Sequence, residues 1–290
     1  MGKNVFATPL LDSTFKLVFG EKQHRTVTID FLNDILERTG TPREIKDISF
    51  AHQELASRKS YDKKSILDIN CTDIQGHQFI VEIQRKSEDF FDWRLFYYAA
   101  SLLSRQLQET DPYSKLKPVV ILGILNFKLY SDFDEPVSHH LVCDTRSGKQ
   151  SINLIELHIV ELGKFNKKVD QLITHIDKWL FFLKKAHEQE SIPAAYNDTP
   201  TIRQAFDIVS RWNWTSEQVA AYDKEVLAFR IEITQELSEI EKLKAGIEQG
   251  KIEEKEAIAL NLLNLQIPFD TIVQATGLSI VEIELLRQKI

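Results

Sequence analysis

The apolar run at residues 119–127, VVILGILNF, constrains the fold of this chain more than any other segment. It is about half as long as a membrane span, and its length fits a strand buried on both faces of a sheet. The segment before it, residues 87–108, has helical periodicity, with a stripe formed by Phe91, Leu95, Tyr98 and Leu102. A helix that leads into such a strand is typical of a crossover connection, so we expect an α/β fold.

Shorter strands are expected on both sides of this helix. Residues 45–55, 66–72 and 79–84 alternate between apolar and polar side chains, and the last two segments are joined by the turn sequence DIQGH. This pattern predicts a β-hairpin. Further strands are expected at residues 140–143 and 152–160.

Helical patterns occupy both ends of the chain. Residues 12–38 predict two short helices, with Asp12 and Ser13 as the N-cap of the first. After Gly163 the strand pattern is lost, and helices are expected at residues 169–186, 202–209 and 216–250. In the tail, residues 256–265, 269–275 and 280–287 predict three further helices, with Gly277 ending the second and Ser279 capping the third.

We therefore expect a first domain at residues 1–165, a helical region with a long charged helix at 166–250, and a helix-turn-helix-like tail at 251–290. The tail suits DNA reading and oligomerisation equally well.

Charge and cysteine content limit the classes of protein that fit. The formal net charge is −7, from 36 basic and 43 acidic residues, whereas nucleic-acid binders more often carry a basic balance. Binding depends on where the charges lie, so local clusters decide the matter. The two cysteines, Cys71 and Cys143, form neither a disulfide framework nor a zinc motif, and no signal peptide or membrane span is expected. These features predict a cytoplasmic protein with no membrane partner.

The hairpin places two acidic residues face to face. If residues 74–76 form a three-residue loop with Gly76 in the left-handed conformation, Asp73 pairs with His77 and Asp68 lies opposite Glu82. Directly opposed carboxylates repel each other unless a cation neutralises them. The geometry predicts a Mg²⁺ site, with Mn²⁺ as a substitute, at which phosphodiester bonds are hydrolysed. The alternative is that both residues lie on a solvated face of the sheet.

Basic side chains flank this hairpin. The sequence RKSYDKK, residues 58–64, leads into the strand of Asp68, and Arg85 and Lys86 follow Gln84. Lys63, Lys64, Arg85 and Lys86 are therefore candidate phosphate contacts, while solvation alone also accounts for a basic loop.

These motifs, taken in order, resemble one family. DSTFKLVF at residues 12–19, ILDIN around Asp68, VEIQ ending at Gln84, RLFYYAASLLSRQL, Tyr113 before KPVVILGIL, and the closing TGLSIVEIELL are similar to the PD-(D/E)XK nuclease family of transposases, also called recombination-promoting nucleases. The resemblance covers nearly the whole chain. It implies a restriction-endonuclease-like core with a central mixed β-sheet flanked by helices, Mg²⁺-dependent DNA cleavage, and a role in recombination or mobile elements.

The resemblance also implies roles for individual residues. Asp68 and Glu82 would bind the metal, and Asp68, Glu82 and Gln84 would form the catalytic centre. Gln84 stands where the wider superfamily has a lysine, so the metal or Lys86 must supply the missing positive charge. Asp12 and Arg94 are candidates for supporting the site, an N-cap being the alternative for Asp12.

Three further patterns bear on function. Core packing is the preferred interpretation of Tyr97. His139 and His140 are adjacent on a strand and point to opposite faces, so they are expected to be ordinary surface histidines that share no metal. Sequence motifs for nucleotide hydrolysis, serine esterases and zinc proteases are missing from the chain.

The sequence therefore predicts a metal-dependent DNA endonuclease that forms a homodimer, since cutting both strands needs two active sites. The alternative is a nuclease fold that has lost catalysis and serves as a DNA-binding or protein-interaction module. The net acidity and Gln84 favour this alternative, and the intact pair of Asp68 and Glu82 disfavours it.

Overall fold

The structure of the protein is a computed structural model that describes residues 5–38, 40, 44–51, 54–55 and 65–288. The chain divides into two compact units, Met1–Asp223 and Lys224–Ile290. The division into three domains expected from the sequence stays a prediction. The strands are β1 (Ile48–Phe50), β2 (Glu54–Leu55), β3 (Ser65–Ile66), β4 (Ile69–Asp73), β5 (Gln78–Gln84), β6 (Val119–Leu125), β7 (Val137–Cys143) and β8 (Gln150–Glu161).

Helices make up most of the remaining regular structure. The α-helices are α1 (Asp12–Phe19), α2 (Arg25–Arg38), α3 (Phe91–Arg105), α4 (His175–Lys185), α5 (Pro200–Val209), α6 (Ser216–Asn264), α7 (Phe269–Thr276) and α8 (Ile280–Arg287). Short 3₁₀ helices are η1 (Lys22–His24), η2 (Tyr113–Lys115), η3 (Val169–Gln171), η4 (Ala186–Glu188), η5 (Ala194–Tyr196) and η6 (Arg211–Asn213). None of the helices in the described part of the chain is long and apolar enough to cross a membrane.

The first unit is built on one mixed sheet of six strands in the order β1-β4-β5-β6-β8-β7. β5 pairs with β6 and β6 with β8 in parallel, while the other neighbours are antiparallel. Because α3 lies between β5 and β6 in sequence, it forms the crossover that parallel pairing requires. This confirms the predicted α/β fold with a central mixed sheet flanked by helices.

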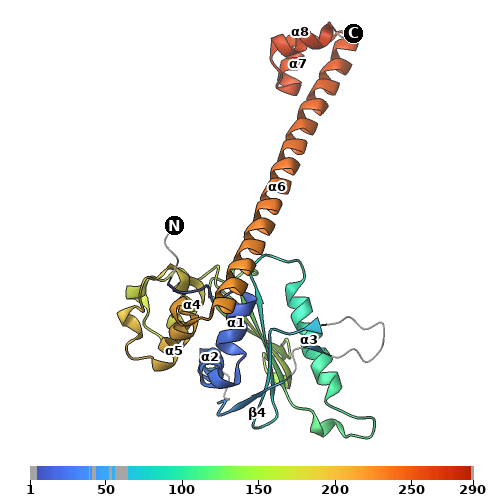
Figure 1. The fold of residues 1–290 in the computed structure, drawn as a ribbon. Helices are drawn as coiled ribbons and strands as arrows, with labels where there is room; N and C mark the ends of the chain where they lie inside the picture. The colour runs from blue at the N-terminus through green and yellow to red at the C-terminus, as the bar shows by residue number, and fades with distance from the viewer. Residues whose placement is uncertain (1–4, 39, 41–43, 52–53, 56–64, 289–290) are drawn as a thin grey trace. The chain divides into compact units, whose positions relative to one another are not determined.

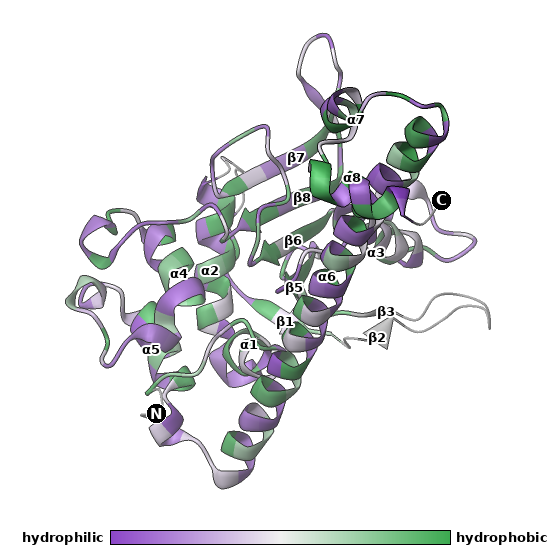
Figure 2. Cartoon of the chain, turned by 90° about the horizontal axis from the view of Figure 1, so that it is seen from above, coloured by the Kyte–Doolittle hydropathy of each residue, from purple (hydrophilic) through white to green (hydrophobic). Residues whose placement is uncertain are grey.

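Helices cover both faces of the sheet (Figures 1 and 2), with α3 on one side and α1, α2, α4 and α5 on the other. Every residue of β6 is buried, as its apolar sequence predicted. The predicted stripe of α3 packs on the sheet in a core that contains Phe91, Leu95, Tyr98, Leu102, Ile80, Ile121 and Ile159. On the helical side, the aromatic rings of Phe19, Phe31 and Trp179 contact one another.

Several elements are shorter than their sequence patterns predicted. The strand expected at residues 66–72 is interrupted at Leu67 and Asp68, and the strand expected at 45–55 becomes β1 and β2. The helix expected from residue 169 begins only at His175, because Thr174 forms a capping box with Asp177 at that point. The predicted N-cap at Asp12 and Ser13 is wrong, since α1 already includes both residues and Leu11 occupies the cap position.

The segment that leads into α1 is fixed by residues far away in the sequence. Phe6 forms an isolated β-bridge with Ser210. The amide of Ala7 donates to the carbonyl of Val209 at 2.8 Å, and the amide of Arg211 donates to the carbonyl of Val5 at 3.0 Å. These bonds tie the start of α1 to the end of α5.

The second unit contains most of α6 together with α7 and α8. The helix expected at residues 256–265 is the continuation of α6, which runs unbroken to Asn264. Gly277 ends α7 with φ 69°, and Ser279 caps α8 in a capping box with Glu282, as the sequence predicted. The small core of this unit is formed by Ala259, Ile272, Leu278, Ile283 and Leu286.

Candidate metal centre

The predicted register of the β4–β5 hairpin is confirmed. Ile69 pairs with Val81 and Asn70 with Ile80, so the same register places Asp68 opposite Glu82. The amide of Asp73 donates to the carbonyl of His77 at 3.0 Å. Gly76 has φ 87°, the left-handed conformation that the three-residue loop requires.

The turn is held closed by Asp73. Its Oδ1 accepts the amides of Gln75 and His77 at 2.8 and 2.9 Å. Its Oδ2 lies 2.7 Å from Nδ1 of His77. Because these bonds fix the loop length, they also fix which residues face each other at the open end of the hairpin.

At that open end, the two predicted carboxylates accept hydrogen bonds from backbone amides, in place of the backbone carbonyls that accept them along the rest of the hairpin. The backbone bends at Asp68, one residue before β4 begins. The amide of Asp68 donates to Oε1 of Glu82 at 3.0 Å, and the amide of Ile83 donates to Oδ2 of Asp68 at 2.8 Å. Each carboxylate is thus oriented by the backbone of the opposite segment, and both are held at one place.

Helix α1 brings two more charged groups to this place. Asp12 and Lys16 are one turn apart, with 2.7 Å between Oδ1 and Nζ. Nζ of Lys16 also lies 3.9 Å from Oδ1 of Asp68. Asp12 is a hydrogen-bonding neighbour of Asp68. The structure therefore brings Asp12 to the predicted site, beside Asp68.

Burial makes the carboxylates of this site costly to ionise. Burial raises the pKa of Asp68 to about 6, and the negative charge of Asp12 raises it as well, against the lowering effect of the Ile83 amide and of Lys16. Burial raises the pKa of Glu82 to about 8, and the charge of Asp68 adds to this. Charges that the fold has removed from water are costly unless a proton or a bound cation offsets them.

Helix α3 supplies the remaining polar groups. Arg94 donates from one terminal nitrogen to Oε1 of Gln84 at 3.0 Å, and from the other to both carboxylate oxygens of Glu88 at 2.7 and 2.6 Å. The Arg94 guanidinium lies 4.9 Å from the centre of the Phe91 ring. Arg94 thus orients the side chain of Gln84, and Glu88 holds Arg94 in place.

The close approach of α3 depends on a glycine in β6. Gly123 pairs with Glu82 in the parallel register. A Cβ atom at Gly123 would lie 2.7 Å from Cδ1 of Leu95 and 3.2 Å from the ring of Phe91. Only a residue without a side chain lets α3 pack this closely over the strand that neighbours Glu82.

The other sequence-predicted site residues have mixed outcomes. Lys63 and Lys64 lie outside the described residues. Arg85 and Lys86 follow β5 directly and are half-buried. The prediction that Tyr97 packs in the core is wrong, since 47% of this residue is exposed while its neighbour Tyr98 is buried.

Lys16 is the residue that sequence reasoning missed. The motif DSTFK contains the signal, because a spacing of four residues puts Asp12 and Lys16 on one face of a helix. Their nearness to Asp68 depends on how α1 packs against the sheet, which no local pattern shows.

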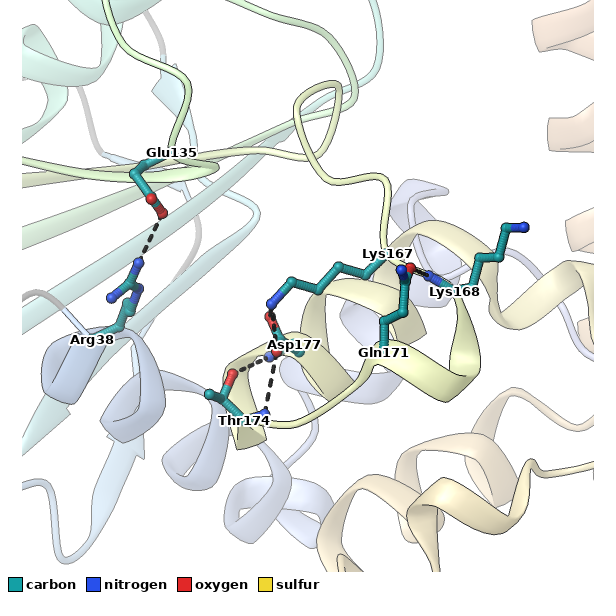
Figure 3. Close-up of polar contacts among 7 residues, drawn as sticks. All are labelled: Arg38, Glu135, Lys167, Lys168, Gln171, Thr174 and Asp177. Atoms are coloured by element: carbon teal, nitrogen blue, oxygen red, sulfur yellow. Dashed lines mark hydrogen bonds and ion pairs between the residues drawn. The ribbon is translucent and has the colours of Figure 1, made fainter.

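One cavity in the described part of the chain lies away from this centre. It has a volume of about 650 Å³ and is lined by residues of α2, α4 and the segment before β7. Figure 3 shows polar contacts at its wall: Arg38 with Glu135 at 2.8 Å, and Lys167 with the Asp177 carboxylate that also takes part in the α4 capping box. Asp12, Asp68 and Glu82 are not among the residues that line this cavity.

Comparison with known protein families identifies the chain. The PD-(D/E)XK nuclease family transposase profile matches residues 9–230, which contain every residue of the centre described above. Searches among curated proteins and among solved structures gave no match. PD-(D/E)XK nucleases generally use divalent metals, and the oxygen ligands and positions of Asp68 and Glu82 agree with this. The chain belongs to the PD-(D/E)XK nuclease family of transposases.

Proposed function

We propose that this protein is a Mg²⁺-dependent DNA endonuclease that acts in recombination or on mobile elements, with Mn²⁺ as a substitute metal. The observation that carries the proposal is the facing pair of Asp68 and Glu82, a half-buried and a buried carboxylate held at one point by reciprocal backbone hydrogen bonds. Family membership supports nuclease chemistry and DNA as the substrate class.

The donor set fits a hard divalent cation. Asp68 and Glu82 would hold the ion, and Asp12 stands close enough to Asp68 to contribute a third carboxylate. Carboxylate oxygens are the ligands that Mg²⁺ prefers, and a bound ion would offset the cost of ionising these groups, whose pKa values are raised in the metal-free protein. When bound, Mg²⁺ would supply positive charge that offsets the charge building on the scissile phosphate.

Lys16 would supply the positive charge that Gln84 cannot. Its ammonium group is positioned by Asp12 and reaches toward Asp68, so it stands beside the carboxylates although it comes from α1 rather than from β5. A fixed ammonium group at this place favours attack on phosphate by stabilising negative charge in the transition state. This assignment replaces Lys86 as the first candidate for that role.

Gln84 and Arg94 would act together at the edge of the site. Gln84 accepts a hydrogen bond from Arg94, so its amide is held in one orientation from which it can position water or phosphate. Arg94 is a positioning residue in this scheme. Cleavage of both DNA strands would need two such centres, and a homodimer would provide them.

The test is plasmid nicking by the full chain in Mg²⁺ or Mn²⁺. Asp68→Asn and Glu82→Gln keep an oxygen that accepts the partner amide, so they remove charge with little change in shape. We expect each to lower cleavage about 100-fold or more. Glu109→Gln, an exposed residue beyond α3, is the matched control and should cleave like the natural chain.

Two other outcomes would contradict the proposal. Equal cleavage by all of these variants would show that the activity comes from another site or another protein. DNA binding without cleavage, and with no effect of Mg²⁺ on affinity, would favour a binding module, the reading to which the net charge of −7 and Gln84 point.

A further inference from the structure

A second group of metal-ligating side chains lies on β7 and β8. His139 of β7 pairs directly with His158 of β8, and Glu156 is two residues before His158 on the same face of the sheet. One ligand atom from each of the three residues lies within 4.8 Å of the other two. His158 is fully buried, Glu156 is 4% exposed, and the His139 side chain is 15% exposed.

These side chains correct an expectation drawn from the sequence. His139 and His140 do point to opposite faces, but neither is an ordinary surface histidine. His140 contacts Tyr130 and lies 2.9 Å from the hydroxyl of Ser138. His139 stacks on His158, with ring centres 4.2 Å apart and planes 13° from parallel.

The three side chains lie close enough for one ion to draw them together. Nε2 of His139 and Nε2 of His158 each lie 3.9 Å from Oε2 of Glu156. This is longer than a direct hydrogen bond, which spans about 2.7 to 3.2 Å. Zinc binds nitrogen at about 2.0 to 2.1 Å and carboxylate oxygen at about 2.0 to 2.2 Å, so the ligand atoms of a tetrahedral ion are about 3.4 Å apart, and binding would draw these atoms about half an ångström closer together.

Binding of an ion would change how the two rings lie. The lone pair of an imidazole nitrogen lies in the plane of its ring, so binding of one ion would tilt the two near-parallel rings, now 4.2 Å apart, toward a common point. Imidazole nitrogen selects zinc and its neighbours in the transition series over Mg²⁺, which prefers oxygen. We propose that His139, Glu156 and His158 form a binding site for one Zn²⁺ ion.

This site is separate from the carboxylate centre. In the register of the sheet, Glu82 pairs with Gly123 and Gly123 with Ile159, so the side chains of Glu82 and Ile159 lie on one face of the sheet. His158 is adjacent to Ile159 in β8, so its side chain lies on the opposite face. Two strand spacings, about 10 Å, separate β5 from β8. One ion cannot be shared by the two groups.

An acidic cavity opens close to the proposed site. Val137, two residues before His139 and on the same face of β7, lines the 650 Å³ cavity. Its lining carries more acidic than basic residues, the acidic ones being Asp34, Glu37, Asp134, Glu135 and Asp177. Negative charge there would raise the local concentration of cations beside β7.

Binding of Zn²⁺ would pin the edge strand β7 to β8. β7 is the last strand of the sheet, and its register with β8 shifts after Leu141. An ion held by residues of both strands would stabilise this pairing in the folded state alone, so it would raise the melting temperature of the first unit.

The test is a Zn²⁺ titration of the full chain after metal removal, in excess Mg²⁺, with bound metal measured after dialysis. We expect one equivalent of Zn²⁺ per chain. His139→Gln and Glu156→Gln should each weaken its binding at least about 100-fold. His140→Gln, the neighbour on the opposite face, is the matched control and should keep it. Cobalt replaces zinc in a second measurement on the natural chain, where nitrogen ligation gives a visible absorption band.

The result is independent of nuclease activity. The double variant Asp68→Asn, Glu82→Gln should still bind one Zn²⁺, even if the proposed endonuclease function proves wrong. A natural chain that retains neither Zn²⁺ nor Co²⁺ in excess Mg²⁺ overturns the proposal. Retention of the full equivalent by His139→Gln and Glu156→Gln overturns it as well.

Discussion

Replacing Glu82 with glutamine is expected to stabilise the metal-free protein at alkaline pH. Burial, with the charge of Asp68 as the next cause, raises the pKa of Glu82 from 4.5 to about 8. Between these two pH values the folded state keeps a proton that the unfolded chain has lost. The free energy of unfolding therefore falls as pH rises through this window.

The size of the effect follows from the same pKa values. At about 1.4 kcal/mol for each tenfold change in the proton equilibrium, ionising Glu82 in the folded state costs about 5 kcal/mol at full effect. Glutamine has the same shape, carries no charge, and keeps an oxygen to accept the amide of Asp68. At pH 8.5 the variant should exceed the natural chain by about 3 to 5 kcal/mol, and at pH 5.5 by only about 1 kcal/mol.

Urea unfolding followed by tryptophan fluorescence measures this difference. All four tryptophans, at positions 93, 179, 212 and 214, lie in the first unit, so the signal reports the unit that contains Glu82. The experiment is run in a chelator, with Glu109→Gln as the control that should show no pH-dependent gain. A natural chain as stable as the Glu82 variant at pH 8.5 would refute the reasoning, because Glu82 would then not be held in a costly ionised state.

Three further predictions concern the same centre. Mg²⁺ binding at pH 7 should release about one proton per chain, since Glu82 with a pKa of about 8 is mostly protonated there; calorimetry in two buffers of different ionisation enthalpy measures this, and a value near zero would speak against Glu82 as a ligand. Lys16→Met should lower kcat about 100-fold with little change in KM, whereas Lys16→Arg should retain part of the activity; an unchanged kcat in single-turnover nicking would remove Lys16 from the mechanism. Gly123→Ala should lower the free energy of unfolding by about 1 to 3 kcal/mol, because the new methyl group collides with Leu95; urea unfolding with no loss of stability would show that α3 moves freely.

The parts of the centre that local rules determine could be predicted from the sequence. The period of two along a strand and the left-handed glycine at position 76 set the register of the hairpin, so the opposition of Asp68 and Glu82 followed from residues 66–84 alone. The buried stripe of α3 and the buried strand β6 followed in the same way from periodicity.

The parts that depend on long-range packing could not. Lys16 reaches Asp68 across 52 positions of sequence, and its role shows only once α1 has packed beside the hairpin. His139 and His158 meet because β7 pairs antiparallel with β8, while the sequence showed only that His139 and its neighbour point to opposite faces. The N-cap expected at Asp12 failed because the helix starts at Asp12 itself, and the Asp12 carboxylate pairs with Lys16 one turn later.

The bonds that tie the start of α1 to the end of α5 have a consequence for folding during synthesis. Asp12 and Lys16 leave the ribosome early, yet their helix is anchored through Phe6 to Ser210. At about 5 to 20 residues per second, the ribosome needs roughly 10 to 40 s to make the intervening chain. Once the hairpin of Asp68 and Glu82 has been made, residues 85–210 take roughly 6 to 25 s more, and for that time the hairpin lacks α1 partners that are fixed in place. The carboxylate centre would therefore be completed late, when almost the whole first unit has been made.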